Sequence, residues 1–256
     1  MRQDRTIRQG PGARTGVVRG RIVALDLARA LALVAMAVFH FAFDLELFGF
    51  AAPGTTMEPG WRWLAYLTAG SFLFLVGVSL WLAHQNGIRW RGYWVRLGMI
   101  VAAALAITVV TWFAMPEAFI FFGILHSIAV ASLLGLLFLR LPAPMLIVLG
   151  VAVICLPQVL RLEALDAPWF WWTGLQALRV PSVDYVPVFP WFGPVLLGIA
   201  TAQIFARTGL WARLSQWEAP AGLRVAAWPG RHSLAVYLLH QPVLVSLVWL
   251  AAQFRA

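Results

Sequence analysis

The sequence is poor in charge and in cysteine, and it contains no lysine. Only 11% of its 256 residues are charged and 62% are hydrophobic, whereas soluble domains carry about 25% charged residues. This composition excludes a soluble globular protein and predicts an integral membrane protein. The single cysteine, Cys155, excludes an internal disulfide and a metal cluster built from cysteines, and we expect no metal site.

All 19 basic residues are arginine, and the formal net charge is +9. The sequence lacks a long polar region that could fold as a soluble domain, so this charge does not indicate nucleic-acid binding. Residues 1–20 are rich in Arg, Gly and Gln without periodicity, which predicts a disordered cytoplasmic tail. The remainder, 21–256, is expected to form one transmembrane domain.

The predicted fold is all-α, a polytopic transmembrane helical bundle. A spanning helix needs about 20 mostly apolar residues, and seven runs approach or reach this length. The count lies between six and eight, because the fifth run is short and the aromatic segment 167–180 is either interfacial, re-entrant or part of a further span. The seven runs are 22–43, 61–83, 93–113, 118–139, 144–160, 187–206 and 232–252.

The distribution of arginine predicts the orientation of these spans. With the N-terminus in the cytoplasm, fourteen arginines fall on the cytoplasmic side and four on the outer side, as the positive-inside rule requires. Arg29 lies within the first span. We therefore expect a cytoplasmic N-terminus.

The first span, "ALDLARALALVAMAVFHFAFDL" (24–45), carries four ionisable residues: Asp26, Arg29, His40 and Asp44. At about 100° per residue these fall within a sector of about 60°, so they form one polar stripe. Charged groups at membrane depth face a bundle interior or a wet cavity. Asp26 and Arg29 lie near the cytoplasmic end of the stripe, and His40 and Asp44 near the outer end.

Each pair has a structural and a functional interpretation. Asp26 and Arg29 form either an ion pair that anchors the helix or, with Arg29 as ligand, a site for phosphate. His40 is either a hydrogen-bonded interior residue or a general base, and Asp44 either ends the helix or orients the imidazole. Arg29 and His40 lie about 16 Å apart along the helix axis, roughly the length of a pantetheine arm.

Three other segments supply candidate cavity-lining residues. His126 and Ser127 lie within the fourth predicted span. On the seventh predicted span, Ser233, Tyr237, His240 and Gln241 fall close together on one face of the helix. The outer segment "DYVPVFPWFGP" is rich in proline and aromatic residues, which suits either a cover for an acceptor pocket or an interfacial belt. The candidates are His126, Ser127, Ser233, Tyr237, His240, Gln241, Asp184, Tyr185 and Trp191.

Five motifs carry a resemblance to a known family. They are "LDLARALALVAMAVFHFAFDL", "SFLFLVGVSLWLA" (71–83), "FFGILHSIAVASLL" (121–134), "DYVPVFPWFGPVLLGIA" (184–200) and "GRHSLAVYLLHQPVL" (230–244). In this order they resemble the heparan-α-glucosaminide N-acetyltransferase catalytic-domain family, in particular its short bacterial members, within the transmembrane acyltransferase superfamily. The spacing Arg29-x10-His40 also matches the Arg/Lys-x10-His pattern of the acyltransferase type three family.

The resemblance implies a membrane acyltransferase that moves an acetyl group from cytoplasmic acetyl-CoA, or another acyl-CoA, to a sugar, glycan or lipid-linked acceptor on the outer side. It implies a bacterial cytoplasmic (inner) membrane as the location, His40 as the catalytic histidine and Arg29 at the basic position. The sequence departs from the family pattern in two places: Ala30 replaces the usual glycine, and the loop 45–60 has no histidine. The second departure puts an acetyl-histidine intermediate and the glucosamine substrate in doubt and leaves direct transfer open.

Two other functions remain open on the sequence. A transporter or flippase would use His40, His126 and His240 to relay protons or to bind its substrate. A haem-bearing electron carrier would use His126 and His240 as iron ligands. A homo-oligomer is compatible with all three functions.

Overall fold

Residues 21–255 are described by the computed structural model, and the predicted tail, 1–20, lies outside them. These residues form α-helices and short 3-10 helices joined by loops. The helices are α1 (Val23–Leu47), α2 (Pro59–His84), α3 (Trp90–Ala114), α4 (Ile124–Phe138), α5 (Ala143–Val159), α6 (Val188–Arg207), α7 (Leu210–Gln216), α8 (Ala221–Ala226), α9 (Trp228–Arg231) and α10 (Ser233–Gln253). The 3-10 helices are η1 (Thr55–Met57), η2 (Glu163–Leu165) and η3 (Pro168–Thr173).

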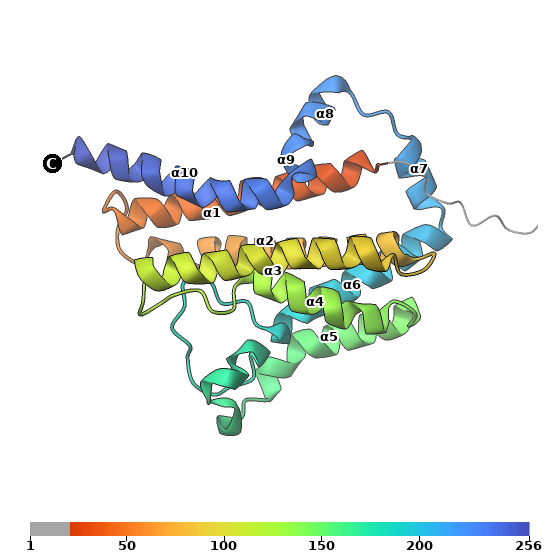
Figure 1. The fold of residues 1–256 in the computed structure, drawn as a ribbon, viewed down its shortest axis with the longest axis horizontal. Helices are drawn as coiled ribbons and strands as arrows, with labels where there is room; N and C mark the ends of the chain where they lie inside the picture. Colours follow the sequence, from red (N-terminus) through yellow and green to blue (C-terminus); the bar gives the residue numbers. More distant parts are fainter. Residues whose placement is uncertain (1–20, 256) are drawn as a thin grey trace, which may run out of the picture.

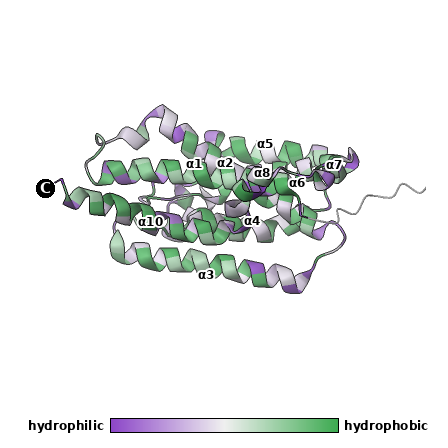
Figure 2. Cartoon of the chain, turned by 90° about the horizontal axis from the view of Figure 1, so that it is seen from above, coloured by the Kyte–Doolittle hydropathy of each residue, from purple (hydrophilic) through white to green (hydrophobic). Residues whose placement is uncertain are grey.

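The long helices run side by side and form a bundle (Figure 1). Helix α6 packs against α2, α4 and α5, while α3 packs against α4. Helix α1 packs against α2 on one side and against α9 and α10 on the other. Hydrophobic residues cover the long helices, and hydrophilic residues gather toward the helix ends and loops (Figure 2).

The predicted all-α polytopic bundle is confirmed. A helix lies at each of the seven predicted spans, and five of them are long and apolar enough to cross a membrane: α1, α2, α3, α6 and α10. Helices α4 and α5 are shorter, with 15 and 17 residues. The segment 167–180 contains only η3 and is not a further spanning helix.

Helix α4 begins six residues later than the sequence predicts, at Ile124 rather than at 118. The residues before it, 118–123, are not helical and pair instead with the segment that precedes α6. The N–H of Val183 donates to the carbonyl of Ala118, and the N–H of Val186 donates to that of Phe122, both at 3.0 Å. These bonds pair backbone groups of a non-helical segment that is packed within protein, as such a segment near a membrane requires.

Two glycines allow α6 to lie directly against α2. A Cβ atom at Gly77 would overlap the carbonyl oxygen of Val195, and a Cβ atom at Gly198 would overlap that of Phe74. Because lipid removes the hydrophobic drive for helix association, close backbone approach at small residues stabilises such contacts. Ser79 of α2 lies toward α1, where its hydroxyl contacts Arg29.

Candidate functional site

The N-terminal end of the polar stripe on α1 is an ion-pair cluster centred on Asp26. The Asp26 side chain is only 2% exposed. Its carboxylate lies 2.9 Å from Nη1 of Arg29, 2.5 Å from Nε of Arg21 and 3.8 Å from Nε of Arg231. The predicted pair of Asp26 and Arg29 is therefore present, and it belongs to a larger cluster in which three guanidinium groups surround one carboxylate.

Helix α9 enters this cluster because of a glycine. A Cβ atom at Gly230 would overlap the backbone carbonyl oxygen of Asp26, so only glycine lets α9 lie this close to α1. The next residue, Arg231, then reaches the carboxylate of Asp26. On the other side, Nη2 of Arg29 donates to Oγ of Ser79 on α2 at 2.7 Å, which directs the guanidinium across the space between the helices.

A cavity of about 590 Å³ opens beside this cluster, between α1, α2, α3, α4 and the start of α10. Arg29, Arg96 and Arg231 line it together with Ser79 and His232. The rest of its wall is mainly apolar and includes Phe72, Leu75, Met99, Ile100, Leu125, Ile128, Leu234 and Leu238. A cavity with arginine on one part of its wall and hydrocarbon on the rest suits an amphiphilic anion.

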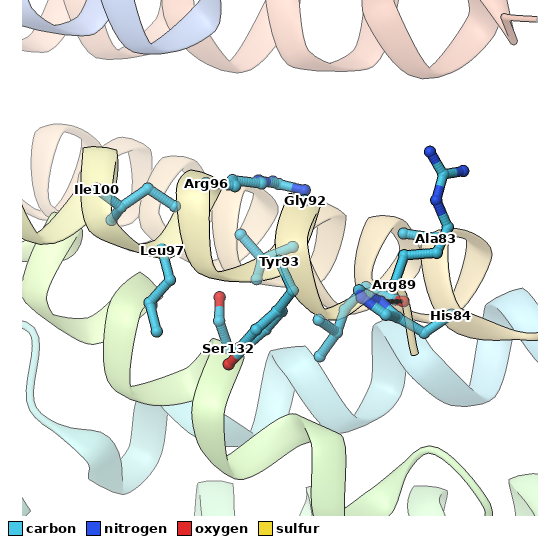
Figure 3. Close-up of a pocket in the computed structure, with 11 residues that line it drawn as sticks. Ala83, His84, Arg89, Gly92, Tyr93, Arg96, Leu97, Ile100 and Ser132 are labelled. Carbon is cyan, nitrogen blue, oxygen red and sulfur yellow. Dashed lines mark hydrogen bonds between the residues drawn. The ribbon is translucent and has the colours of Figure 1, made fainter. Parts of the chain in front are cut away.

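A second cavity of about 240 Å³ adjoins the first, and Arg96 lines both. Figure 3 shows Arg89, Tyr93 and Arg96 at the N-terminal part of α3, with His84 at the end of α2 and Ser132 on α4. Together the two cavities collect four arginine side chains: Arg29, Arg89, Arg96 and Arg231.

The C-terminal end of the stripe meets α10. The ring centroids of His40 and His240 lie 5.1 Å apart, with their planes inclined by 60°. Asp44 is fully buried, and its Oδ1 accepts a hydrogen bond of 2.8 Å from Nε2 of Gln241. The structure therefore brings together His40, Asp44, His240 and Gln241. Within residues 21–255 the predicted contact between Asp44 and His40 is not formed, and Oδ1 of Asp44 binds Gln241 instead.

One face of α10 connects the two ends, as its sequence spacing predicts. Ser233 and Tyr237 line the large cavity, and the Tyr237 ring lies 5.6 Å from that of His240. Tyr237 thus continues a path from the arginine-lined cavity to His240 and His40. The polar stripes on α1 and α10 meet at His40 and His240 and at Asp44 and Gln241.

His126 lies apart from this path, and both of its ring nitrogens bind other protein groups. Its Nδ1 accepts a hydrogen bond of 3.2 Å from the backbone N–H of Gly123, so Nε2 carries the hydrogen and lies 3.2 Å from Oγ1 of Thr108. Both ring nitrogens are engaged at the start of α4, which leaves neither free to ligate a haem iron. Neither His126 nor the buried Ser127 lines the two cavities.

The outer candidates Asp184, Tyr185 and Trp191 also bind protein groups. The carboxylate of Asp184 accepts from the N–H of Ile124 at 3.0 Å and so caps α4. The Tyr185 hydroxyl donates to the carbonyl of Trp171 and accepts from the side chain of Gln176. Trp191 lies beside Tyr66, with ring centroids 6.0 Å apart. Asp184 and Trp191 therefore contact α4 and α2, while Tyr185 binds the segment that contains η3, and none of the three lines the two cavities described above.

Asp184 gives the fold a pH dependence. Burial raises the pKa of Asp184 to about 6, although the hydrogen bond from the N–H of Ile124 acts in the opposite direction and lowers the pKa. Because the folded state holds this proton more tightly than the unfolded state, the contribution of Asp184 to stability is expected to be greatest below about pH 4 and to fall, by up to about 3 kcal/mol, as the pH rises to about 6. In Asp184→Asn, whose amide oxygen still accepts from Ile124, this fall should disappear when melting temperatures are compared across that range; an unchanged fall would contradict the assignment.

Sequence reasoning missed Arg96, Arg231 and Ser79 as cavity residues. The two arginines were counted only toward membrane orientation, since each lies near a predicted cytoplasmic helix end. Gly230, directly before Arg231, was the available signal, because a glycine next to a charged residue marks a possible close approach of two backbones.

A comparison with known protein families finds a match over most of the chain. Residues 21–242 match the family described as "Heparan-alpha-glucosaminide N-acetyltransferase, catalytic". Searches of curated proteins and of solved structures find no match. The match spans all four ionisable residues of α1 and the polar face of α10. It supports a membrane acetyltransferase-type role, and this chain belongs to the heparan-alpha-glucosaminide N-acetyltransferase catalytic-domain family.

Proposed function

We propose that this protein transfers an acyl group, in the first place acetyl, from acyl-CoA to a sugar or other glycan-type acceptor. The observation that supports the proposal is the path between α1 and α10. Three arginines line a cavity at one end of it, and two histidines lie against each other at the other end. Donor and acceptor would meet at the histidine end.

The arginine end suits the phosphates of the donor. A guanidinium group can donate two parallel hydrogen bonds to a phosphate. These charge-assisted hydrogen bonds are stronger than hydrogen bonds between neutral groups. Arg231 contributes a buried Nε with no hydrogen-bond partner within residues 21–255, and a phosphate oxygen would satisfy it. The apolar wall beyond the arginines would hold the pantetheine arm, and the roughly 16 Å between Arg29 and His40 along the helix matches its reach.

The histidine end suits the transfer itself. The hydroxyl or amine of the acceptor would attack the thioester carbonyl beside His40, which we propose as a catalytic residue. The new C–O or C–N bond forms as the C–S bond breaks, and the acceptor proton ends on the sulfur of CoA. The loop 45–60 contains no histidine, so we propose direct transfer without an acetyl-histidine.

We also propose the sidedness of this reaction. The arginine asymmetry favours a cytoplasmic N-terminus, which places the Asp26 cluster on the side where acyl-CoA is found. His40 and His240 then lie toward the outer side of a bacterial inner membrane, where the glycan or lipid-linked acceptor would bind.

The test is donor binding and transfer by the purified protein in lipid nanodiscs. We expect it to bind acetyl-CoA, and Arg29→Gln to weaken that binding about tenfold, which corresponds to about 1.4 kcal/mol. Arg62→Gln is the matched control, because it removes the same charge from an exposed position at the start of α2, away from the cavity. Radiolabelled acetyl-CoA with glucosamine and with lipid-linked sugars then reports transfer.

Two results would reject the proposal. Failure of the wild-type protein to bind acetyl-CoA would exclude the acyltransferase function and favour a transporter. Equal binding by the Arg29→Gln and Arg62→Gln proteins would exclude the arginine cavity as the donor site.

A further inference from the structure

The hydrogen bonding of His240 determines which of its nitrogens carries a hydrogen. Nδ1 lies 2.6 Å from the backbone carbonyl oxygen of Tyr237. A carbonyl oxygen only accepts, so Nδ1 is the donor and holds the hydrogen. In the neutral ring Nε2 is therefore the nitrogen with the free lone pair. The contact with Tyr237 also holds the ring in place on α10.

This lone pair is buried and has no partner. Within residues 21–255, Nε2 of His240 makes no hydrogen bond, and neither do Oδ2 of Asp44 and Oε1 of Gln241. Unpaired buried polar atoms lose their hydrogen bonds to water without replacement and are uncommon. All three atoms act as hydrogen-bond acceptors, so the group that would satisfy them is a hydrogen-bond donor. The hydroxyl and amino groups of a sugar are such donors.

His40 lacks the support that His240 has. It makes no side-chain hydrogen bond within the described residues, and Asp44, its expected partner, bonds to Gln241 instead. A general base works best when a third group orients it and fixes its tautomer. The carbonyl of Tyr237 does this for His240, while nothing comparable acts on His40.

We propose that His240 is the general base of the transfer and that Asp44 and Gln241 bind further donor groups of the acceptor. This assignment rests on the proposed function. The acceptor O–H or N–H donates to Nε2 of His240, which takes the proton as the new bond to the acyl carbon forms. When the C–S bond breaks, the proton passes to the sulfur and leaves as the thiol of CoA.

His40 has a complementary role in this scheme. Its ring lies against that of His240. In this scheme a ring N–H of His40 donates to the oxygen on which negative charge develops. Within residues 21–255, the ionisable groups around His240 are His40 on α1, Tyr237 one turn back on α10, Asp44, which binds the adjacent Gln241, and Asp184, which lies near Tyr237 from the segment before α6. Arg231 on α9 lies at the other end of the path, against Asp26.

The first test compares His240→Gln with His40→Gln in the transfer assay across pH. Glutamine keeps a donor but is not a base. We expect His240→Gln to lower kcat about 10²- to 10⁴-fold, with little change in the affinity for acetyl-CoA, and to abolish the fall in rate at acid pH. His40→Gln should keep that fall and lose less activity, because its amide still donates.

The opposite pattern, in which His40→Gln abolishes the acid limb and His240→Gln retains it, would overturn the assignment and leave the proposed function intact. Failure of the wild-type protein to transfer at all would instead reject the proposed function, and this assignment with it.

A second measurement does not require turnover. In protein labelled with ¹⁵N-histidine, the signals lost in His240→Gln identify this residue. We expect them to show a hydrogen on Nδ1 and a bare Nε2 in the neutral ring, and the Nε2 signal to shift when glucosamine is added as a probe of the acceptor site. A hydrogen on Nε2 of the neutral ring would overturn the proposal.

Discussion

Replacing His40 by alanine is expected to reduce acetyl transfer about 100- to 1000-fold, the range found when a single donor to a developing oxyanion is removed. Folding should be little affected, because His40 makes no side-chain hydrogen bond within residues 21–255 and its removal leaves no partner unpaired. The affinity for acetyl-CoA should also change little, since the donor phosphates would bind at the arginine end. The measurement is kcat, together with the binding constant and the melting temperature.

The control is His126→Ala, which removes the same side chain at the start of α4, outside the proposed transfer site. Its loss should leave the N–H of Gly123 without its acceptor at the start of α4, so we expect a lower melting temperature and a smaller loss of kcat. A loss of kcat in His126→Ala that equals or exceeds that in His40→Ala would reverse the assignment.

Replacing Asp26 by asparagine is expected to destabilise the fold by about 3–5 kcal/mol, as when one partner of a buried ion pair is lost. The carboxylate is the anion against which Arg29 and Arg231 both lie, and these side chains are 24% and 31% exposed. Without it, two partly buried guanidinium groups face each other and α9 loses its polar contact with α1. Thermal or denaturant unfolding of the purified protein measures the change.

Arg21→Gln is the matched control for this prediction. Arg21 also contacts Asp26, but its side chain is 57% exposed, and exposed ion pairs contribute about 0–1 kcal/mol. We therefore expect less than about 1 kcal/mol from Arg21→Gln. If Asp26→Asn were equally mild, Asp26 would not be the centre of the cluster.

Much of the fold follows from local features of the chain. Each long apolar run forms a helix, because backbone groups in lipid must bond within their own segment. The polar stripe on α1 also follows from spacing alone, since residues that share a helical face remain together in any packing. The later start of α4 could not be predicted from local sequence, because residues 118–123 bond to backbone groups some 65 positions later in the chain.

By itself, the sequence determined that the protein is a membrane bundle, which family it belongs to, and that Arg29 and His40 lie on one face of the first helix. Only the tertiary structure decided the partners of these residues. Gly230 lets Arg231 reach Asp26, and α10 brings Gln241 to Asp44 and His240 to His40. The physical reason is that helical periodicity sets the direction of side chains within one helix, whereas the hydrogen bond between Asp44 on α1 and Gln241 on α10 joins residues 197 positions apart in the chain.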